Sequence, residues 1–251
     1  MKQGAVYQSL ERRCGLGQRS YWVLLDPDDF SPREGAQRAL QAQEHGAHAV
    51  LIGGSLLYSS GFDSFVAAVK EAIDLPVLLF PGDATQLSRH ADALLFLSLV
   101  SGRNPVNLIG EHVKAAPLVR EMGIETIATA YLLVESGAVT SVEFMSNTRP
   151  IPRTKPGIAA AHALAAQYQG MALVYLEAGS GALQPVPADM VRLVKSQIDV
   201  PLVVGGGIRD AGTARSLYDA GADVLVTGNH LSTPDGPSLM RAVAALAAEK
   251  R

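Results

Sequence analysis

Apolar and polar positions alternate in blocks along this chain: eight short apolar runs are separated by stretches with helical spacing. Continuous apolar runs are typical of parallel strands that helices cover on both faces. The runs are Tyr21–Leu25, Ala49–Ile52, Pro76–Phe80, Ala93–Leu97, Glu125–Val134, Met171–Val174, Pro201–Val204 and Val224–Val226. An open, doubly wound sheet would also produce this alternation. Eight units within 251 residues favour a closed (β/α)₈ TIM-like barrel, as one domain over residues 1–251 with a lead-in helix or loop over residues 1–20.

The stretches between the runs carry helix signals of different strength. Ser31-Pro-Arg-Glu34 combines a serine cap, a proline at the first helical position and a glutamate at the third, which predicts a helix from there to His45. Only a short helical piece near Ala84–His90 fits after the third run, so we expect a shortened third helix. Glu135–Lys155 is irregular, and we expect a lid, a subunit contact or both. Further helices are predicted near residues 62–73, 107–122, 156–168, 188–197, 210–220 and 237–250.

The composition narrows the class of protein. Hydrophobic residues make up 48% of the chain, and the formal net charge is −3 with a sequence pI of about 6.1. A protein that binds nucleic acid broadly needs a basic face, so we expect no nucleic-acid partner. The single cysteine, Cys14, lies among polar residues with no base beside it, which suits a reducing compartment and argues against a catalytic thiol. No apolar stretch is long enough to span a membrane, and we expect a cytoplasmic protein.

Glycine-rich turns follow the last three apolar runs. Gly179-Ser180-Gly181 comes after the sixth run, Gly205-Gly-Gly-Ile-Arg209 after the seventh and Thr227-Gly-Asn229 after the eighth. In a barrel, the strand ends after runs seven and eight are common phosphate sites, because glycine lets backbone N–H groups approach an anion. Glycines could also do no more than turn tight corners. Three such turns in succession favour a phosphate cradle.

Glu177 ends the sixth strand, where a buried carboxylate needs either a partner or a function. It could accept a proton as a general base and hydrogen-bond substrate hydroxyls. A structural ion pair with Lys155 or Arg209 is the alternative. Tyr175 lies two residues earlier, so on a strand its side chain shares the direction of Glu177 and could donate to the same ligand.

Asp26-Pro-Asp28 follows the first strand and forms an oxygen-rich turn. Mg²⁺ prefers one or two carboxylates with substrate phosphates and water, so Asp26 and the hydroxyl of Ser55 from the next loop could supply an incomplete metal shell. An ordinary turn is the alternative. Zinc is disfavoured, because the six histidines show no H-x-x-x-H spacing.

Taken together, these motifs resemble the geranylgeranylglyceryl phosphate synthase family, prenyltransferases of ether-lipid synthesis, along nearly the whole chain. The distinguishing set is Tyr175–Gly181 with the two later glycine turns. The alanine-rich helix within Arg149–Tyr168 resembles the larger subgroup, whose members form higher homo-oligomers. The other matching pieces are Leu25–Asp28, Ile52–Ser55, Arg103–Pro105, Leu108–Gly110 and Phe144–Asn147.

The resemblance implies that a polyprenyl diphosphate, with geranylgeranyl as the expected tail, is joined to the C3 hydroxyl of sn-glycerol 1-phosphate. It implies Mg²⁺ at Asp26 and Ser55, with Glu177 and Tyr175 as catalytic residues. It also implies transient contact with a membrane surface and a homo-oligomer, either a hexamer or a dimer. Glycerol phosphate would bind Tyr175, Leu176, Glu177, Ala178, Gly179, Ser180, Gly181, Gly206, Gly207, Gly228 and Asn229.

Two positions depart from the family's usual pattern. Asp29 stands where lysine is usual, which removes a positive charge near the expected diphosphate, and Val106-Asn107 stands where an aromatic residue is common. Two alternative functions also stay open. One is a phosphosugar isomerase, lyase or synthase on the same barrel, although no predicted strand ends in lysine. The other is a barrel that binds a phosphorylated ligand without catalysis.

Overall fold

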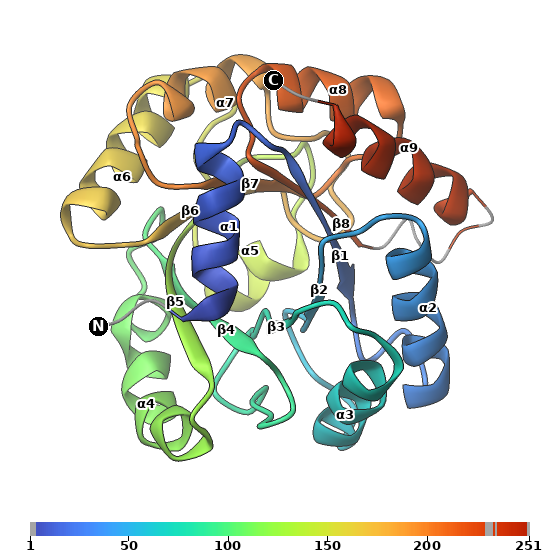
Figure 1. Ribbon diagram of the computed structural model, residues 1–251. Helices are drawn as coiled ribbons and strands as arrows, with labels where there is room; N and C mark the ends of the chain where they lie inside the picture. Colours follow the sequence, from blue (N-terminus) through green and yellow to red (C-terminus); the bar gives the residue numbers. More distant parts are fainter. Residues whose placement is uncertain (1–3, 229–232, 234, 250–251) are drawn as a thin grey trace.

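Eight parallel strands close into a barrel in the computed structural model, which describes residues 4–228, 233 and 235–249 (Figure 1). The strands follow one another around the barrel in chain order, and β1 pairs with β8 to close it. The predicted TIM-like barrel and its eight strands are therefore confirmed. Their bounds are β1 Ser20–Leu25, β2 Ala49–Ile52, β3 Val77–Leu79, β4 Ala93–Leu99, β5 Glu125–Leu133, β6 Leu173–Glu177, β7 Leu202–Gly205 and β8 Val224–Thr227.

Helices form an outer ring around the strands (Figure 1). Ser31 and Glu34 form the predicted capping box at the start of α2, and Gly123 ends α4 in the left-handed conformation. A short π-helical turn, η1 at Val106–Gly110, precedes α4. The bounds are α1 Ala5–Gly15, α2 Pro32–Glu44, α3 Phe62–Ala72, α4 Glu111–Met122, α5 Ser141–Ser146, α6 Pro156–Tyr168, α7 Ala188–Lys195, α8 Ala211–Asp219 and α9 Gly236–Ala248.

Side chains alternate between two cores along each strand. Trp22, Leu51 and Leu95 point into the barrel, whereas Val23, Val50 and Leu94 pack between the barrel and its helices. This alternation follows from the two-residue period of a strand, with apolar positions on both faces.

The lead-in segment forms α1, which lies across one end of the barrel (Figure 1). The carboxylate of Glu125, at the start of β5, accepts hydrogen bonds from Val6 N and Tyr7 N at 2.9 and 2.8 Å. Tyr7 and Leu10 complete the interior core at that end. Because α1 covers the N-terminal ends of the strands, the opposite end is left for ligand binding.

The third unit differs from the prediction. Residues 80–92, all of which the structure describes, form turns without a helix, so the short helix expected near Ala84–His90 is wrong. The side chain of Asp83 accepts from both Thr85 N, at 2.7 Å, and Thr85 Oγ1, at 2.6 Å. Local bonds of this kind compete with helical ones, and Pro81 and Gly82 also disfavour a helix. We call residues 80–92 the connecting segment.

The irregular stretch after β5 has a compact structure. Val134 and Ile151 form an isolated parallel β-bridge, and the segment of chain between these two residues contains α5. The alanine-rich helix spans Pro156–Tyr168, as predicted, and residues 149–155 before it are not helical. In Figure 1, α5 lies near the barrel axis, behind α1. The stretch therefore covers part of the barrel end opposite α1.

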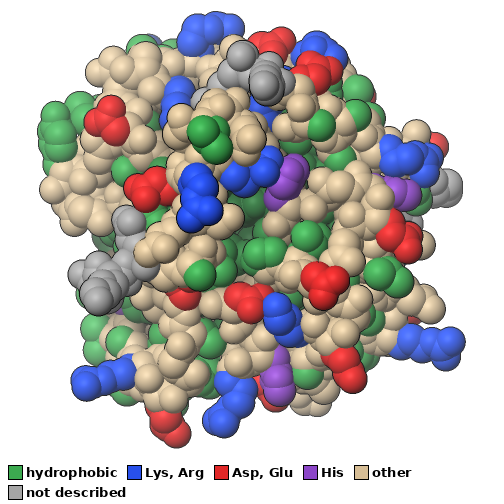
Figure 2. Space-filling model, viewed as in Figure 1, with side chains coloured by type: hydrophobic (Ala, Val, Ile, Leu, Met, Phe, Trp, Pro, Cys, Tyr) green, Lys and Arg blue, Asp and Glu red, His purple; other side chains and the backbone are tan. Residues whose placement is uncertain are grey.

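Acidic and basic side chains are interspersed on the face seen in Figure 2. This mixture agrees with the formal net charge of −3. Within the described ranges, no helix is long and apolar enough to cross a bilayer.

Candidate active site

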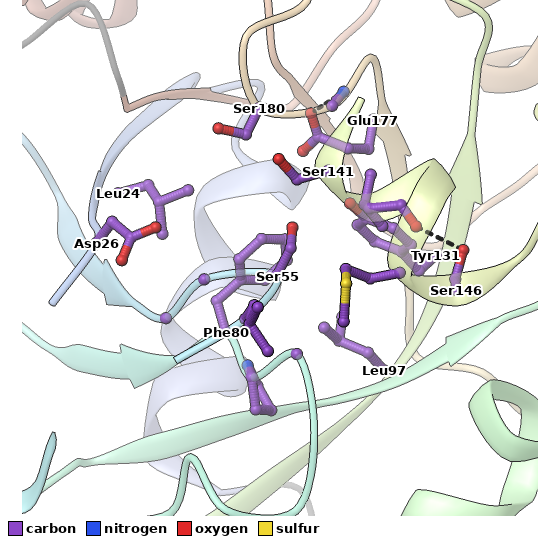
Figure 3. Close-up of a pocket in the computed structure, with 18 of the residues that line it drawn as sticks. Leu24, Asp26, Ser55, Phe80, Leu97, Tyr131, Ser141, Ser146, Glu177 and Ser180 are labelled. Atoms are coloured by element: carbon purple, nitrogen blue, oxygen red, sulfur yellow. Dashed lines mark hydrogen bonds between the residues drawn. The ribbon is translucent and has the colours of Figure 1, made fainter. Parts of the chain in front are cut away.

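A cavity of about 1160 Å³ occupies the C-terminal end of the barrel. Asp26 at the end of β1 and Glu177 at the end of β6 both line it, together with Ser55, Ser180, Gly206 and Gly228. Figure 3 shows the carboxylates of Asp26 and Glu177 on opposite sides of the same space. Its volume exceeds the roughly 300–1,000 Å³ of most small-molecule sites, so two substrates can fit together.

Glu177 is buried, with 5% of its surface exposed. Gly179 N donates to Glu177 Oε1 at 2.6 Å, and none of the ion pairs among the described residues involves Glu177. Arg209 instead donates to Ala182 O, so the alternative ion pair is not formed. Burial raises the pKa of Glu177 to about 7, although the bond from Gly179 N–H works in the opposite direction. A carboxylate with this pKa suits a general base near neutral pH.

The raised pKa predicts a pH-dependent stability penalty at Glu177. The folded pKa of about 7 lies above the ordinary value of 4.5, so the folded state binds more protons between these values and stability falls as pH rises through that window. One pKa unit corresponds to 1.36 kcal/mol, so the penalty reaches about 3 kcal/mol above neutral pH. Glu177→Gln should therefore be more stable than wild type at about pH 8.5, and this advantage should vanish near pH 5.

Urea unfolding of both proteins at the two pH values measures this difference. Glu125→Gln is the matched control, because that carboxylate caps α1 at the opposite end of the barrel. It should lower stability at both pH values. An equal stability difference between wild type and Glu177→Gln at both pH values would contradict the raised pKa.

Three aromatic rings form one wall of the cavity. The ring centroid of Phe80 lies 5.3 Å from that of Tyr175 and 5.8 Å from that of Tyr131, and the two tyrosine centroids are 5.5 Å apart. Tyr175 Oη is buried without a hydrogen bond of good geometry, and burial raises the pKa of Tyr175 well above 10. The phenol is therefore neutral, and its O–H lies beside the Glu177 carboxylate, with which it interacts.

The glycines after β6 and β7 have left-handed backbones. The φ angles of Gly179, Gly181, Gly206 and Gly207 are 97°, 75°, 77° and 71°. A Cβ added at Gly206 would lie 2.3 Å from Glu177 Oε1 and 3.0 Å from Gly179 N. Only glycine fits there, because a side chain would both strain the backbone and displace Glu177. Because glycine lets the backbone approach an anion closely, these two loops beside Glu177 suit the predicted phosphate cradle.

Gly206→Ala should weaken binding of glycerol phosphate by at least about tenfold, because the added methyl group collides with Glu177 and with the loop after β6. Isothermal titration calorimetry measures the affinity. Gly123→Ala is the matched control: its φ is +70°, but an added Cβ has no neighbour within 4 Å. It isolates the cost of the backbone conformation. Equal affinity in Gly206→Ala and wild type would argue against the cradle.

The β8 side of the predicted cradle is described in part. Gly228 lines the cavity, whereas Asn229 lies outside the described residues. Leu176 and Ala178 are buried within and after β6, while Ser180 and Gly181 are exposed at the loop tip. Leu176 and Ala178 therefore face the core. The other predicted residues from the β6 and β7 ends line the cavity: Tyr175, Glu177, Gly179, Ser180, Gly181, Gly206 and Gly207.

At the opposite side, Asp26 is half-buried, and its Oδ1 accepts from Asp28 N at 3.0 Å. Its carboxylate lies against Gly54: a Cβ added there would be 2.6 Å from Asp26 Oδ2. Ser55 follows directly and also lines the cavity. Burial raises the pKa of Asp26, and the nearby Asp29 and Asp28 add to the shift. These are hard oxygen donors without a complete cage, as Mg²⁺ prefers when substrate phosphates supply further ligands.

The cavity is acidic. Of the described residues that line it, six carry carboxylates and one, Arg209, carries a guanidinium; the acids are Asp26, Asp28, Asp29, Asp83, Glu111 and Glu177. Asp29 is exposed at the rim. A phosphate and a diphosphate in such a space would repel these groups, so a divalent cation fits the donor set at Asp26 and Ser55. No cluster of three or more His, Cys, Asp or Glu ligands occurs among the described residues.

An apolar branch of the cavity runs along the outer face of β4. Leu94 and Phe96 belong to the outer core, yet they line the same cavity as the interior residues Leu95 and Leu97. Leu87 and Ala115 line it as well. No helix forms between β3 and β4, where all residues are described, so the connecting segment covers this strip of the outer wall and an apolar groove lies beside it.

Several lining residues were not predicted. Thr140, Ser141 and Ser146 come from the irregular stretch around α5, Phe80 from the start of the connecting segment and Tyr131 from β5. The alternation of side chains along Glu125–Leu133 could have placed Tyr131 inside the barrel. The sequence carries no comparable signal for α5, because its position depends on contacts between distant segments.

Comparisons with known proteins agree with this geometry. The sequence model of the PcrB family matches residues 14–247. Geranylgeranylglyceryl phosphate synthase of Chitinophaga pinensis is 45% identical over 224 residues, covering 89% of both chains. The synthase of Thermococcus kodakarensis is 49% identical, covering 89% of this chain and 86% of its own.

Solved structures show the same likeness. The (S)-3-O-geranylgeranylglyceryl phosphate synthase of Thermoplasma acidophilum, solved with its substrate sn-glycerol-1-phosphate, has a TM-score of 0.92 and 35% identity, covering 98% of this chain and 99% of its own. Thiamine phosphate pyrophosphorylase of Pyrococcus furiosus, at 13% identity and a TM-score of 0.58, shares the fold alone. The predicted family is therefore confirmed: this chain belongs to the PcrB family, whose matched members here are geranylgeranylglyceryl phosphate synthases.

Proposed function

We propose that this protein is a Mg²⁺-dependent prenyltransferase that joins a polyprenyl diphosphate, with geranylgeranyl as the expected tail, to the C3 hydroxyl of sn-glycerol 1-phosphate. One observation carries the proposal: a single cavity joins the buried base Glu177, the glycine turns, Asp26 and an apolar branch. A phosphosugar enzyme would have no use for the apolar branch. The named relatives with 45–49% identity support the same substrates.

The glycerol phosphate lies over the ends of β6, β7 and β8. Backbone N–H groups of the loops containing Gly179, Gly206 and Gly228 hold its phosphate, and the phenol of Tyr175 donates to a ligand oxygen. Glu177 hydrogen-bonds the C3 hydroxyl. This places the attacking oxygen at the buried carboxylate, with the aromatic wall beside it.

The prenyl diphosphate lies opposite, with its charged end near Asp26 and Ser55 and its tail along Phe96 and Leu87. Mg²⁺, when bound, neutralises charge on the departing diphosphate, and Asp26 with Ser55 would hold it. The C3 oxygen attacks the allylic C1 while the bond from C1 to the diphosphate oxygen breaks. The hydroxyl proton passes to Glu177, and pyrophosphate leaves. The faces of Phe80 and Tyr131 exclude water and favour positive charge developing at C1.

Contact with a membrane surface and assembly into a homo-oligomer both stay predictions. Exposed apolar side chains stand around the cavity mouth: Tyr58 is 83% exposed, Val139 70% and Phe144 78%. They support brief contact of the mouth with a lipid surface that supplies the donor or receives the product, and α5 residues could instead lie in a contact between copies of the chain. Co-sedimentation with vesicles and analytical ultracentrifugation of wild type and Phe144→Asp separate the two.

The reaction itself is tested by incubating the purified protein with labelled sn-glycerol 1-phosphate, Mg²⁺ and prenyl diphosphates of several lengths. The expected result is a prenyl ether and pyrophosphate in equal amounts, lost when Mg²⁺ is chelated. Glycerol phosphate binding without an ether product would favour the non-catalytic alternative. Parallel reactions with sn-glycerol 3-phosphate and the series of donors determine the enantiomer and the preferred tail.

A further inference from the structure

Gln86 is a fully buried amide in the connecting segment. Its Nε2 donates to Gly54 O at 2.8 Å, and its Oε1 accepts from Gly54 N at 3.1 Å. One side chain thus holds both hydrogen-bonding groups of a single residue, much as a neighbouring strand would. Gln86 does not line the cavity, so it acts on the cavity through the loop after β2, to which it bonds at Gly54.

Gly54 lies directly against Asp26. A Cβ added at Gly54 would be 2.6 Å from Asp26 Oδ2 and 3.0 Å from Oδ1, and Ser55 is the next residue. A change in the position of the Gly54 backbone therefore moves the Ser55 hydroxyl and opens or closes the space around the Asp26 carboxylate. The proposed diphosphate half of the site depends on the position of this loop.

The connecting segment has other anchors. Ala84 N donates to Glu111 Oε2 at 2.9 Å, and Ser88 Oγ donates to Asp63 Oδ1 at 2.7 Å. These bonds tie the segment to α4 and α3. Loss of the Gln86 amide would therefore release the loop after β2 while the segment stays attached at two other points.

We propose that Gln86 is a positioning residue for the diphosphate half of the site, holding Gly54 so that Asp26 and Ser55 keep the geometry that a divalent cation and a diphosphate need. The proposal rests on the proposed function. It follows from the two bonds to Gly54 and from the contact of Gly54 with Asp26. The glycerol phosphate half, built on β6 to β8, does not depend on Gln86.

The test compares wild type with Gln86→Met, which keeps the length of the side chain and loses both hydrogen bonds. Gln43→Met is the matched control: Gln43 Oε1 accepts from Asp74 N at 2.8 Å and Leu75 N at 3.3 Å, in the loop before β3. Calorimetry measures binding of inorganic pyrophosphate with Mg²⁺, and separately of sn-glycerol 1-phosphate. Steady-state kinetics give KM for both substrates.

Gln86→Met should weaken Mg²⁺-pyrophosphate binding and raise KM for the prenyl donor by about 10–100-fold, the range for residues that orient metal ligands. Its affinity for glycerol phosphate should stay within about twofold of wild type. Gln43→Met should change neither affinity. Equal losses for both ligands, or equal effects of the two substitutions, would overturn the proposal and leave Gln86 a general stabiliser of the fold.

A second variant, Gln86→Glu, keeps the proposal testable if Gln86→Met does not fold. A neutral carboxyl group can make both bonds to Gly54, whereas an ionised one can only accept from Gly54 N–H. Pyrophosphate affinity relative to wild type at the same pH should therefore fall as pH rises, and a constant ratio would contradict the proposal.

If wild type binds Mg²⁺-pyrophosphate but forms no ether, the proposed reaction fails while the binding comparison still decides the role of Gln86. If wild type binds no Mg²⁺-pyrophosphate, both fail.

Discussion

Glu177→Gln is expected to lower kcat by about 10²–10⁴-fold, the range for loss of a general base. Glutamine keeps an acceptor for Gly179 N–H, which donates to Glu177 Oε1 at 2.6 Å in wild type, so the loop after β6 should stay in place. What is lost is the group that accepts the hydroxyl proton. Affinity for sn-glycerol 1-phosphate should change much less than kcat. Product formation under saturating substrates and calorimetric titration measure the two quantities.

The pH profile separates a base from a merely polar contact. Glu177 must be ionised to accept a proton, so kcat/KM of wild type should rise about tenfold per pH unit below neutrality and level off above the pKa of about 7. The residual activity of Glu177→Gln should lose this dependence. A variant with near-normal rates, or with the same pH profile as wild type, would remove Glu177 from the mechanism.

Asp26→Asn should raise the Mg²⁺ concentration for half-maximal activity, and weaken binding of Mg²⁺-pyrophosphate, by at least about 100-fold. Loss of a residue that only orients a metal ligand costs about 10–100-fold, and loss of the ligand itself should cost more. The amide removes the charge while keeping an oxygen that can accept from Asp28 N, as Asp26 Oδ1 does at 3.0 Å. Titration of activity with Mg²⁺ and calorimetry without the acceptor measure the effect.

Asp29→Asn provides the comparison for Asp26. Asp29 lies in the same turn, lines the same cavity and carries the same charge, but its side chain is exposed at the rim. An exposed charge contributes roughly 1 kcal/mol or less, so this variant should shift Mg²⁺ dependence by only a few-fold. Similar shifts for both variants would mean that Asp26 contributes only general negative charge.

The sequence predicted the parts of this structure that local patterns determine. Apolar runs buried on both faces indicated all eight strands, and the serine–glutamate capping box located the start of α2. The barrel topology then required the ends of β1 and β6 to face one cavity, because all parallel strands end on the same side. Asp26 and Glu177 could be paired for that reason, although 151 positions separate them in the chain.

The parts that escaped prediction depend on contacts between distant segments. Residues 84–90 have helical composition, but the bonds from Thr85 to Asp83, and from Ala84 to Glu111, hold another conformation. The amide of Gln86 hydrogen-bonds to Gly54, which lies 32 positions earlier in the chain, and no sequence spacing indicates such a pair. Likewise, nothing near Thr140 in the sequence indicates that it packs against Gly179.

Over the residues that the structure describes, the ring of helices is interrupted between α3 and α4, and the apolar branch lies at that interruption. Under the proposed function, the hydrocarbon tail lies along this one stretch of wall, away from the glycine turns that would bind phosphate. Changes in that stretch can alter how long a lipid the protein accommodates without touching its chemistry. Substitutions that change the preferred tail length can then be selected independently of those that change the reaction.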